Sequence, residues 1–410
     1  MDFVHWARPA DGHTPFPVAE CPDFFALPAP CSGNGCSDPA PPGFAPSHVH
    51  KHSDGGDWYT FGVYADGAVG TSGTWAPYGN TSDPRGLPLD ASALLPGSMK
   101  FYASKSFYDP VGAGRRIYWG WALVPPASTQ TLPRVTTYHA ALQRLIFTPL
   151  PELAQLRGAA LFTAPALAVP PNGTVPLSAG WAPGAGNTSE VALSFALPAA
   201  GAPTTFGLRL FGARGKAPSN ALEFTYDPAG PALSVAWAGS AQPPSYYMPG
   251  VDMPGDDLSV TNVNYTDPRL CQLACNNTPA CTGFVYVVRP PLAGSCCLKS
   301  GYPALDANPT CTSGVKPGGP GPSPARGTPI PLLRGDAALD VHLFVDNSFV
   351  EVFLMEGRLA LTLLFDGNPV SDVGMELFAG AGGAAATGVG VWGVNSIWVT
   401  KEEVLAGRGT

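Results

Sequence analysis

Short runs of alternating apolar and polar residues, separated by turn-forming residues, recur along most of this 410-residue chain. Residues 191–197 (VALSFAL) and 205–211 (TFGLRLF) show the period of two that half-buried strands have, and residues 57–64 (DWYTFGVY) are rich in aromatic and β-branched side chains. The turns draw on 49 glycines and 47 prolines, whereas charged residues, which long surface helices need, make up only 13%. We therefore expect an all-β protein built as a propeller, a sandwich or a barrel.

One segment departs from the strand pattern. Residues 149–158 (PLPELAQLRG) begin with prolines, place apolar side chains at Leu153 and Leu156, and end on Gly158. Proline in the first turn and glycine after the last are helix boundary signals. The sequence predicts one short helix here, at a junction between two β regions.

Six of the nine cysteines crowd between residues 271 and 311. Because none of the nine lies in the Cys-x-x-Cys arrangement typical of structural zinc, we expect a disulfide framework, no metal ion, and an oxidising compartment. The spacing does not choose among the pairings. Asn-x-Ser/Thr sequons support the same compartment and occur at Asn80, Asn172, Asn187, Asn264 and Asn276.

These features predict a secreted, cell-wall or vacuolar protein, although residues 1–6 have neither the basic head nor the apolar core of a signal peptide. No apolar run reaches the length of a membrane span, so we expect no membrane insertion. The net charge of −8 argues against nucleic acid as a partner, since phosphate binding needs a positive field.

Residues 16–25 (FPVAECPDFF) hold the strongest candidate for catalysis, Glu20. The flanking residues predict an apolar setting, and burial of that kind keeps a carboxyl protonated and able to give its proton to a leaving oxygen. Retaining glycosidases pair such an acid with a second, nucleophilic carboxylate. The alternative is a glutamate that caps a turn beside an aromatic cluster.

Other residues admit two interpretations each. Cys21 is either a reactive thiol or a buried cysteine that tunes Glu20. Trp75, Trp119 and Trp121 either stack on sugar rings or fill the core of a sheet. His48, His50 and His52 alternate on an expected strand; we favour an exposed polar face over a metal site, because no carboxylate or cysteine accompanies them in the pattern.

The run around Glu20 resembles the acid/base motif of glycoside hydrolase family 32, the invertases and fructan hydrolases. Residues 51–62, 101–122, 132–157 and 345–362 are similar to further segments of that family and follow its order. The resemblance implies a five-bladed β-propeller followed by a β-sandwich, which removes terminal β-D-fructofuranosyl residues from sucrose or fructans by a retaining mechanism without a cofactor. It makes Glu20 the acid/base and implies substrate contacts from Cys21, Asp23, Lys100 and Trp121.

The chain also departs from the family. The nucleophile aspartate of a Trp-Met-Asn-Asp-Pro-Asn type motif and the stabilising aspartate of an Arg-Asp-Pro motif have no match, and only 19 residues precede Glu20. We therefore expect a partial propeller of about three blades without its nucleophile region, and little or no activity from the chain alone. Gly97 stands where the family has an aspartate that orients sucrose with Lys100, which favours fructan.

Residues 271–275, 281–286 and 296–300 resemble a PAN/Apple domain. That resemblance implies a glycan or protein ligand; the alternative is a stabilising insertion that binds nothing. The resulting domain order is a partial propeller over 1–148, a linker helix over 149–158, a β-sandwich over 159–244 and 327–405, the PAN/Apple insertion over 245–315, and a Pro/Gly linker over 316–326. The competing function is a non-catalytic carbohydrate-binding protein on the same scaffold.

Overall fold

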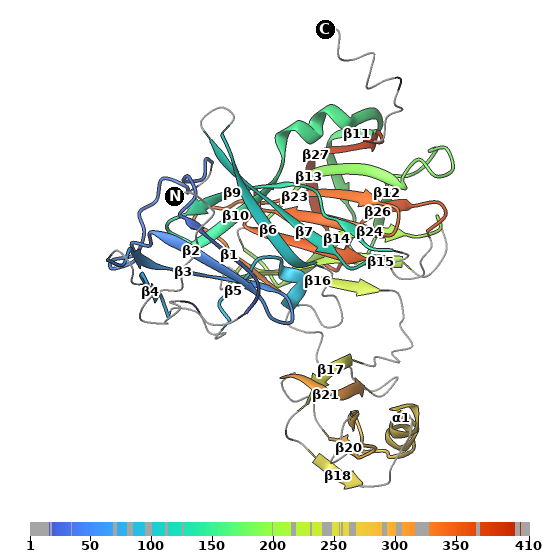
Figure 1. Cartoon of the computed structure of the whole chain (residues 1–410). Helices are drawn as coiled ribbons and strands as arrows, with labels where there is room; N and C mark the ends of the chain where they lie inside the picture. Colours follow the sequence, from blue (N-terminus) through green and yellow to red (C-terminus); the bar gives the residue numbers. More distant parts are fainter. Residues whose placement is uncertain are drawn as a thin grey trace. The chain divides into compact units, whose positions relative to one another are not determined.

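The computed structural model of the chain confirms the expected all-β fold class, a partial propeller followed by a sandwich and a small disulfide-bonded insertion (Figure 1). The structure describes residues 16, 19–33, 35–68, 72–79, 85–94, 101–110, 114–124, 127–198, 200–214, 219–229, 232–239, 248–253, 255, 257–261, 268–288, 293–300, 306–315, 328–365, 370–397 and 402. The chain divides into two compact units, Met1–Trp237 with Ile330–Thr410 (the main unit) and Ala238–Pro329 (the inserted unit). Among the described helices, none has the length and hydropathy needed to cross a membrane.

Two antiparallel sheets form the propeller part of the main unit. The first blade has the order β1-β2-β3-β4, with β5 paired to β3, and consists of β1 (Glu20–Ala26), β2 (His48–Ser53), β3 (Asp57–Ala65), β4 (Thr74–Pro77) and β5 (Leu87–Pro88). The second blade has the order β10-β9-β7-β6, with β8 paired to β7, and consists of β6 (Phe101–Asp109), β7 (Arg115–Ala122), β8 (Thr129–Gln130), β9 (Arg134–His139) and β10 (Arg144–Pro149). We expected about three blades; the described residues form two, because the strands from β1 to β10 pair as two five-stranded sheets.

The two blades share one aromatic core. Side chains from the first blade, such as Phe25 and Tyr59, pack with Tyr118 and Phe147 of the second, and each is less than a tenth exposed. Figure 1 shows the blue first blade beside the teal second blade. Burial of large aromatic side chains supplies much of the energy that holds such sheets together.

The expected linker helix is present as a 3-10 helix, η2 (Pro151–Leu156), with proline at its first position. It is short because β11 begins directly at Arg157. The chain then enters the sandwich without a further loop.

Two six-stranded sheets form the sandwich. One has the order β11-β27-β13-β23-β24-β25 and consists of β11 (Arg157–Val169), β27 (Ala384–Val394), β13 (Thr188–Ala196), β23 (Ala338–Asp346), β24 (Phe349–Leu354) and β25 (Leu359–Leu364). The other has the order β12-β26-β14-β15-β16-β22 and consists of β12 (Thr174–Pro176), β26 (Gly374–Ala379), β14 (Thr204–Phe211), β15 (Ser219–Asp227), β16 (Ala232–Gly239) and β22 (Thr328–Ile330). Inward-facing residues of both sheets, among them Leu193, Phe206 and Leu343, make one buried core.

A buried charge cluster ties the second blade to the sandwich. The Arg134 guanidinium, which is fully buried, donates to Asp90 Oδ2 and to Glu351 Oε2, each at 2.9 Å. Asp90 lies just before the 3-10 helix η1 (Ala91–Leu94), and Glu351 lies on β24. Thr362 of β25 donates to Asp90 Oδ2 and accepts from Arg134, which completes the cluster.

The inserted unit is a five-stranded sheet with one helix. Its strand order is β17-β21-β19-β20-β18, from β17 (Met248–Asp252), β21 (Asp306–Val315), β19 (Gly283–Val287), β20 (Cys296–Lys299) and β18 (Asp257–Thr261), with α1 (Pro268–Asn277). Disulfides Cys271–Cys296 and Cys275–Cys281 hold α1 to the sheet and its adjoining loop, while Cys297 and Cys311 are free thiols. The insertion leaves the sandwich after β16 and returns at β22, and these two strands are hydrogen-bonded neighbours.

Candidate active site

Glu20 is the first residue of β1, and it lines a pocket of about 390 Å³ together with His52, Asp54 and Tyr102. The apolar, buried setting that the flanking residues predicted for Glu20 is wrong, because its side chain is exposed at the start of the strand. Of the aromatic residues that follow it, Phe24 packs on Trp75 of the same blade and Phe25 packs on Tyr118 of the second blade. Glu20 is therefore accessible to a ligand in this pocket.

Tyr102 of β6 holds the Glu20 carboxylate. Its hydroxyl donates to Glu20 Oε2 at 2.6 Å, across the gap between the two blades. Burial raises the pKa of Tyr102, and the hydrogen bond to the Glu20 carboxylate raises it further. The phenol therefore stays protonated and remains a donor to Glu20 over the physiological range.

A β-bulge after Glu20 fixes the direction in which its side chain leaves the strand. The register between β1 and β2 shifts between Glu20 and Asp23, and Cys21 adopts a φ of 43°, in the left-handed region that non-glycine residues rarely occupy. Two lysines hold the bulge: Lys51 donates to the Cys21 carbonyl at 3.2 Å, and Lys105 donates to the Pro22 carbonyl.

Lys51 also joins the two blades beneath this pocket. It is fully buried, pairs with Asp57 at 3.0 Å, and donates to the Ser104 carbonyl of β6 at 2.8 Å. Burial lowers the pKa of Lys51, and the Asp57 carboxylate opposes that shift. Asp57 Oδ2 in turn accepts from the Ser104 backbone N–H at 2.7 Å. This network positions the start of β6, and with it Tyr102, against Glu20.

Three of the four other predicted site residues can be placed, and Lys100 lies outside the described residues. Cys21 is a half-buried free thiol in the bulge. Asp23 Oδ2 accepts from the Ser106 hydroxyl at 2.6 Å and from its backbone N–H, so it links β1 to β6. Trp121 of β7 is 46% exposed and is the cross-strand partner of Tyr102, but it lines a different pocket from Glu20, together with Lys105 and Trp119.

The interpretation of His48, His50 and His52 as an exposed polar face is wrong. His50 is only 3% exposed and stacks on Phe16 with ring centroids 5.0 Å apart, while His48 stacks on Phe24 at 4.9 Å. The alternation of the three histidines on one face of β2 was recognised in the sequence. The aromatic side chains that cover that face, Phe16 and Phe24, come from other segments of the chain. His52 is the member that reaches the Glu20 pocket.

Sequence reasoning missed Tyr102, Asp54 and Asp57 as parts of this site. Tyr102 and Glu20 lie 82 positions apart and on different sheets, so no local pattern links them. Asp57 could have been noticed in the sequence, because it is a charged residue at the start of β3, and the aromatic residues that follow it are buried.

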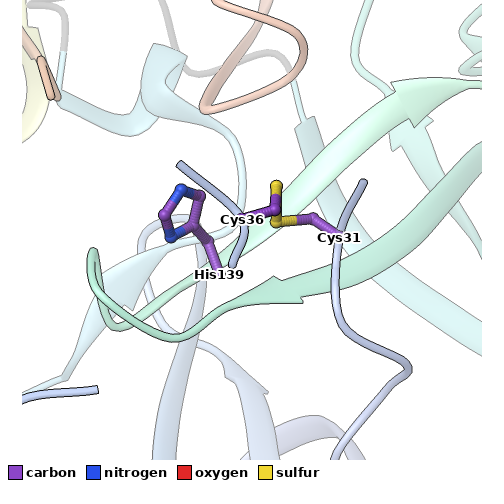
Figure 2. Close-up of side chains that lie close together, drawn as sticks. All are labelled: Cys31, Cys36 and His139. Atoms are coloured by element: carbon purple, nitrogen blue, oxygen red, sulfur yellow. A yellow bond between two sulfur atoms is a disulfide. The ribbon is translucent and has the colours of Figure 1, made fainter. Parts of the chain in front are cut away.

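A separate group, formed by the loop between β1 and β2 and the last residue of β9, has the composition of a metal site. One ring nitrogen of His139 and the sulfurs of Cys31 and Cys36 lie within 4.8 Å of one another, and the two cysteines form a disulfide (Figure 2). In the disulfide state neither sulfur is a thiolate, so the group cannot bind a cation as drawn.

Comparison with known proteins agrees with this architecture. Residues 315–393 match the family model "Glycosyl hydrolases family 32 C terminal", and residues 251–299 match the PAN domain model. Over 174 residues the chain is 33% identical to "Beta-fructofuranosidase, insoluble isoenzyme CWINV4" of Arabidopsis thaliana, covering 38% of this chain and 27% of that protein. It is equally identical over the same length to "Fructan 1-exohydrolase w3" of Triticum aestivum, covering 38% of this chain and 26% of that protein.

The fold is also similar to the crystal structure of fructan 1-exohydrolase IIa from Cichorium intybus, with a TM-score of 0.53 and 18% sequence identity. That match covers 92% of this chain and 62% of the solved chain. The chain thus spans about a quarter of the length of the curated relatives it matches in sequence.

Proposed function

We propose that the chain, whose residues 315–393 match the family 32 C-terminal model, contributes the acid/base half of a β-fructofuranosidase site. The substrates would be sucrose or fructans, cleaved at terminal β-D-fructofuranosyl residues by a retaining mechanism. One observation carries the proposal: Glu20 lies accessible in a pocket while Tyr102 from the neighbouring blade donates to its Oε2 at 2.6 Å.

The contact with Tyr102 supports different roles for the two oxygens of Glu20. Because Oε2 accepts from Tyr102, Oε1 is the oxygen that we propose carries the catalytic proton. Oε1–H would protonate the oxygen of the leaving sugar as the bond to fructose breaks. The resulting carboxylate would then remove a proton from the water that releases fructose, as in other retaining glycosidases.

A retaining reaction also needs a nucleophilic carboxylate, and the family motifs for the nucleophile and the stabiliser have no match in the 410 residues. We therefore propose that a polypeptide segment carrying the nucleophile aspartate completes the site. On the substrate side we place Trp121, whose exposed ring can stack on a sugar, along with Cys21, Asp23 and Lys100. The sequons and disulfides favour a secreted, cell-wall or vacuolar location.

The test combines the chain with a propeller segment that carries the family's nucleophile motif. Glu20→Gln should lower kcat on sucrose or inulin by about a hundred- to ten-thousand-fold, because the amide cannot donate the required proton. The loss should be much smaller on an aryl fructoside, whose leaving group departs without protonation. Cys21→Ser is the matched control next to it and should change kcat far less.

Equal losses of Glu20→Gln on good and poor leaving groups would show that Glu20 is structural and would overturn the assignment. Activity that never arises with any nucleophile-bearing segment would favour the second candidate function, a non-catalytic carbohydrate-binding protein. That candidate is favoured by the missing nucleophile motif, and it predicts retention of fructan on the immobilised chain without release of fructose. A glycan or protein ligand of the PAN domain is a further proposal, tested by the same retention assay on the chain without the inserted unit.

A further inference from the structure

The side chains of Cys31 and Cys36, from the loop between β1 and β2, meet His139 at the end of β9 (Figure 2), and none of the three lines the Glu20 pocket. Two sulfurs and an imidazole nitrogen within 4.8 Å are a ligand set that Zn²⁺ prefers. We propose that this group is a redox-gated zinc site, closed as a disulfide when oxidised and able to bind Zn²⁺ when reduced.

The spacing of the two cysteines supports the proposal. Cys31-Ser-Gly-Asn-Gly-Cys36 places four residues between them, within the range that zinc-binding loops use. Gly33 and Gly35 have φ values of 116° and 71°, which turn the loop back on itself. The Cys36 N–H donates to the Gly33 carbonyl at 3.3 Å, so the turn also has a backbone hydrogen bond.

The third ligand is held in place by backbone pairing that does not depend on the disulfide. The Cys31 N–H donates to the Tyr138 carbonyl at 2.9 Å, and the Tyr138 N–H donates to the Ala29 carbonyl at 3.0 Å. Tyr138 directly precedes His139 on β9, and the His139 side chain is only 1% exposed. Cys31 and His139 therefore remain neighbours after the sulfur–sulfur bond is broken, which lowers the entropy cost of binding a cation.

The disulfide must be reduced before the two sulfurs can bind Zn²⁺. A thiol reductant transfers two electrons and two protons to the Cys31–Cys36 disulfide, which yields two thiols and an oxidised reductant. Zn²⁺ then displaces both thiol protons to solvent and accepts electron pairs from two thiolates and one neutral imidazole nitrogen. Both cysteines are half-buried, so water can take the fourth position. If Nδ1 is the ligand atom, Zn²⁺ replaces the long 3.4 Å hydrogen bond from the Leu142 N–H.

The test measures alkylation of individual cysteines in the full chain. The protein is reduced with a phosphine, which is itself oxidised to the phosphine oxide, and is then treated with iodoacetamide with and without Zn²⁺. Peptide mapping should show that Zn²⁺ protects Cys31 and Cys36 from alkylation. His139→Asn should raise the Zn²⁺ concentration needed for this protection by roughly ten- to hundredfold or more, because it removes a ligand. Because the readout is specific to each cysteine, zinc bound by the thiols of the inserted unit does not enter it.

Since His139 is buried, its variant is first compared with the wild type in the oxidised state by thermal unfolding. If it does not fold, Cys36→Ser at the half-buried position serves instead, with protection of Cys31 as the readout. Loss of zinc protection at Cys31 supports the site. The proposal is overturned if alkylation of Cys31 and Cys36 is the same with and without Zn²⁺. It is also overturned if Zn²⁺ still protects Cys31 in both the His139→Asn and the Cys36→Ser variants. None of these outcomes depends on catalysis at Glu20.

Discussion

His50 shows how an aromatic cluster can remove a titratable side chain from water. Its ring lies between Phe16, 5.0 Å away, and His52, 5.7 Å away, and is only 3% exposed. Burial, with a smaller contribution from the nearby His52, lowers the pKa of His50 to about 4. The imidazole is therefore neutral in the folded protein over a pH range in which it is already charged in the unfolded chain.

This difference predicts an acid-sensitive stability. As the pH falls from 6.5 towards 4, the unfolded state binds a proton that folded His50 does not, so the free energy of unfolding should fall by about 3 kcal/mol. His50→Phe should flatten that part of the pH profile, because phenylalanine keeps the stacking and does not titrate. Urea unfolding between pH 4 and pH 7 measures it, and His48→Phe, on the same face, is the control. An unchanged slope in His50→Phe would contradict the prediction.

All nine tryptophans lie outside residues 238–329, so tryptophan fluorescence reports on the main unit alone. The unfolding measurements proposed here therefore need no correction for the inserted unit. The same probe serves each variant of the blades and the sandwich.

At this scale the surroundings of a side chain were hard to predict. The catalytic role of Glu20 stays a prediction, and its exposure was not foreseen, because the bulge at Cys21 turns the side chain outward and lysines from other strands hold that bulge. Tyr102 could not be predicted as its partner, since the contact depends on how two sheets pack. Long-range geometry of this kind has no signature in a single sequence.

At the scale of the elements, β9, β24 and the residue before η1 meet in a buried cluster of three charged side chains. Arg134, Asp90 and Glu351 are at most 2% exposed, and the Arg134 guanidinium also lies 4.6 Å from the Phe101 ring centroid. Burial raises the pKa of Glu351, an effect that the charge of Arg134 opposes, while Asp90 and Glu351 together outweigh burial and raise the pKa of Arg134. Each charge here depends on the other two.

Removal of the central cation should therefore be costly. Arg134→Met leaves two buried carboxyl groups without a cation beside them and should lower the free energy of unfolding by about 3–5 kcal/mol. Adding Asp90→Asn and Glu351→Gln should recover part of the loss, because the stranded charges are gone. Urea unfolding followed by tryptophan fluorescence measures both effects.

Arg209→Met is the matched control for the buried cluster. Arg209 pairs with Glu376 at 2.9 Å but is 37% exposed, and loss of a surface pair costs about 1 kcal/mol or less. A similar cost for Arg134 and Arg209 would show that the buried cluster does not hold the blades to the sandwich.

Strand positions were predictable because each strand has its own alternation, and β13, β14 and β23 lie where that pattern placed them. The number of blades was not, because alternation says which residues form strands but not which strands pair. The short helix before β11 was predicted from its proline and its apolar spacing, but its 3-10 geometry follows from the strand that begins directly at Arg157.

For the whole molecule, the chain folds as two compact units whose connections both leave one edge of one sheet. β16 ends at Gly239 and β22 begins at Thr328, and the two strands are neighbours in the order β15-β16-β22. An insertion predicts that residues 240 and 326 lie close in space; both fall outside the described residues, but the adjoining strand ends are neighbours, as an insertion requires. We therefore continue to propose that residues 245–315 are an insertion into the sandwich.

Excision tests this organisation. Joining Gly239 to Thr328 by a short glycine linker should leave the sandwich folded, because its strands and core are contributed by the main unit. Tryptophan fluorescence should show an unfolding midpoint close to that of the full chain. A product that fails to fold, while a control with the same linker inserted at the exposed Asn172 turn folds normally, would contradict the insertion model.

Because β16 and β22 are neighbours, this edge of the sandwich can accept the insertion of other domains. Neighbouring strands lie about 4.8 Å apart. A domain can therefore be inserted between them if its two ends lie close together, whatever its sequence or fold. Many small domains have termini close together and meet that demand. Evolution could exchange the inserted module here without altering a buried residue of the host, and a protein engineer could use the same strands to display a domain of choice.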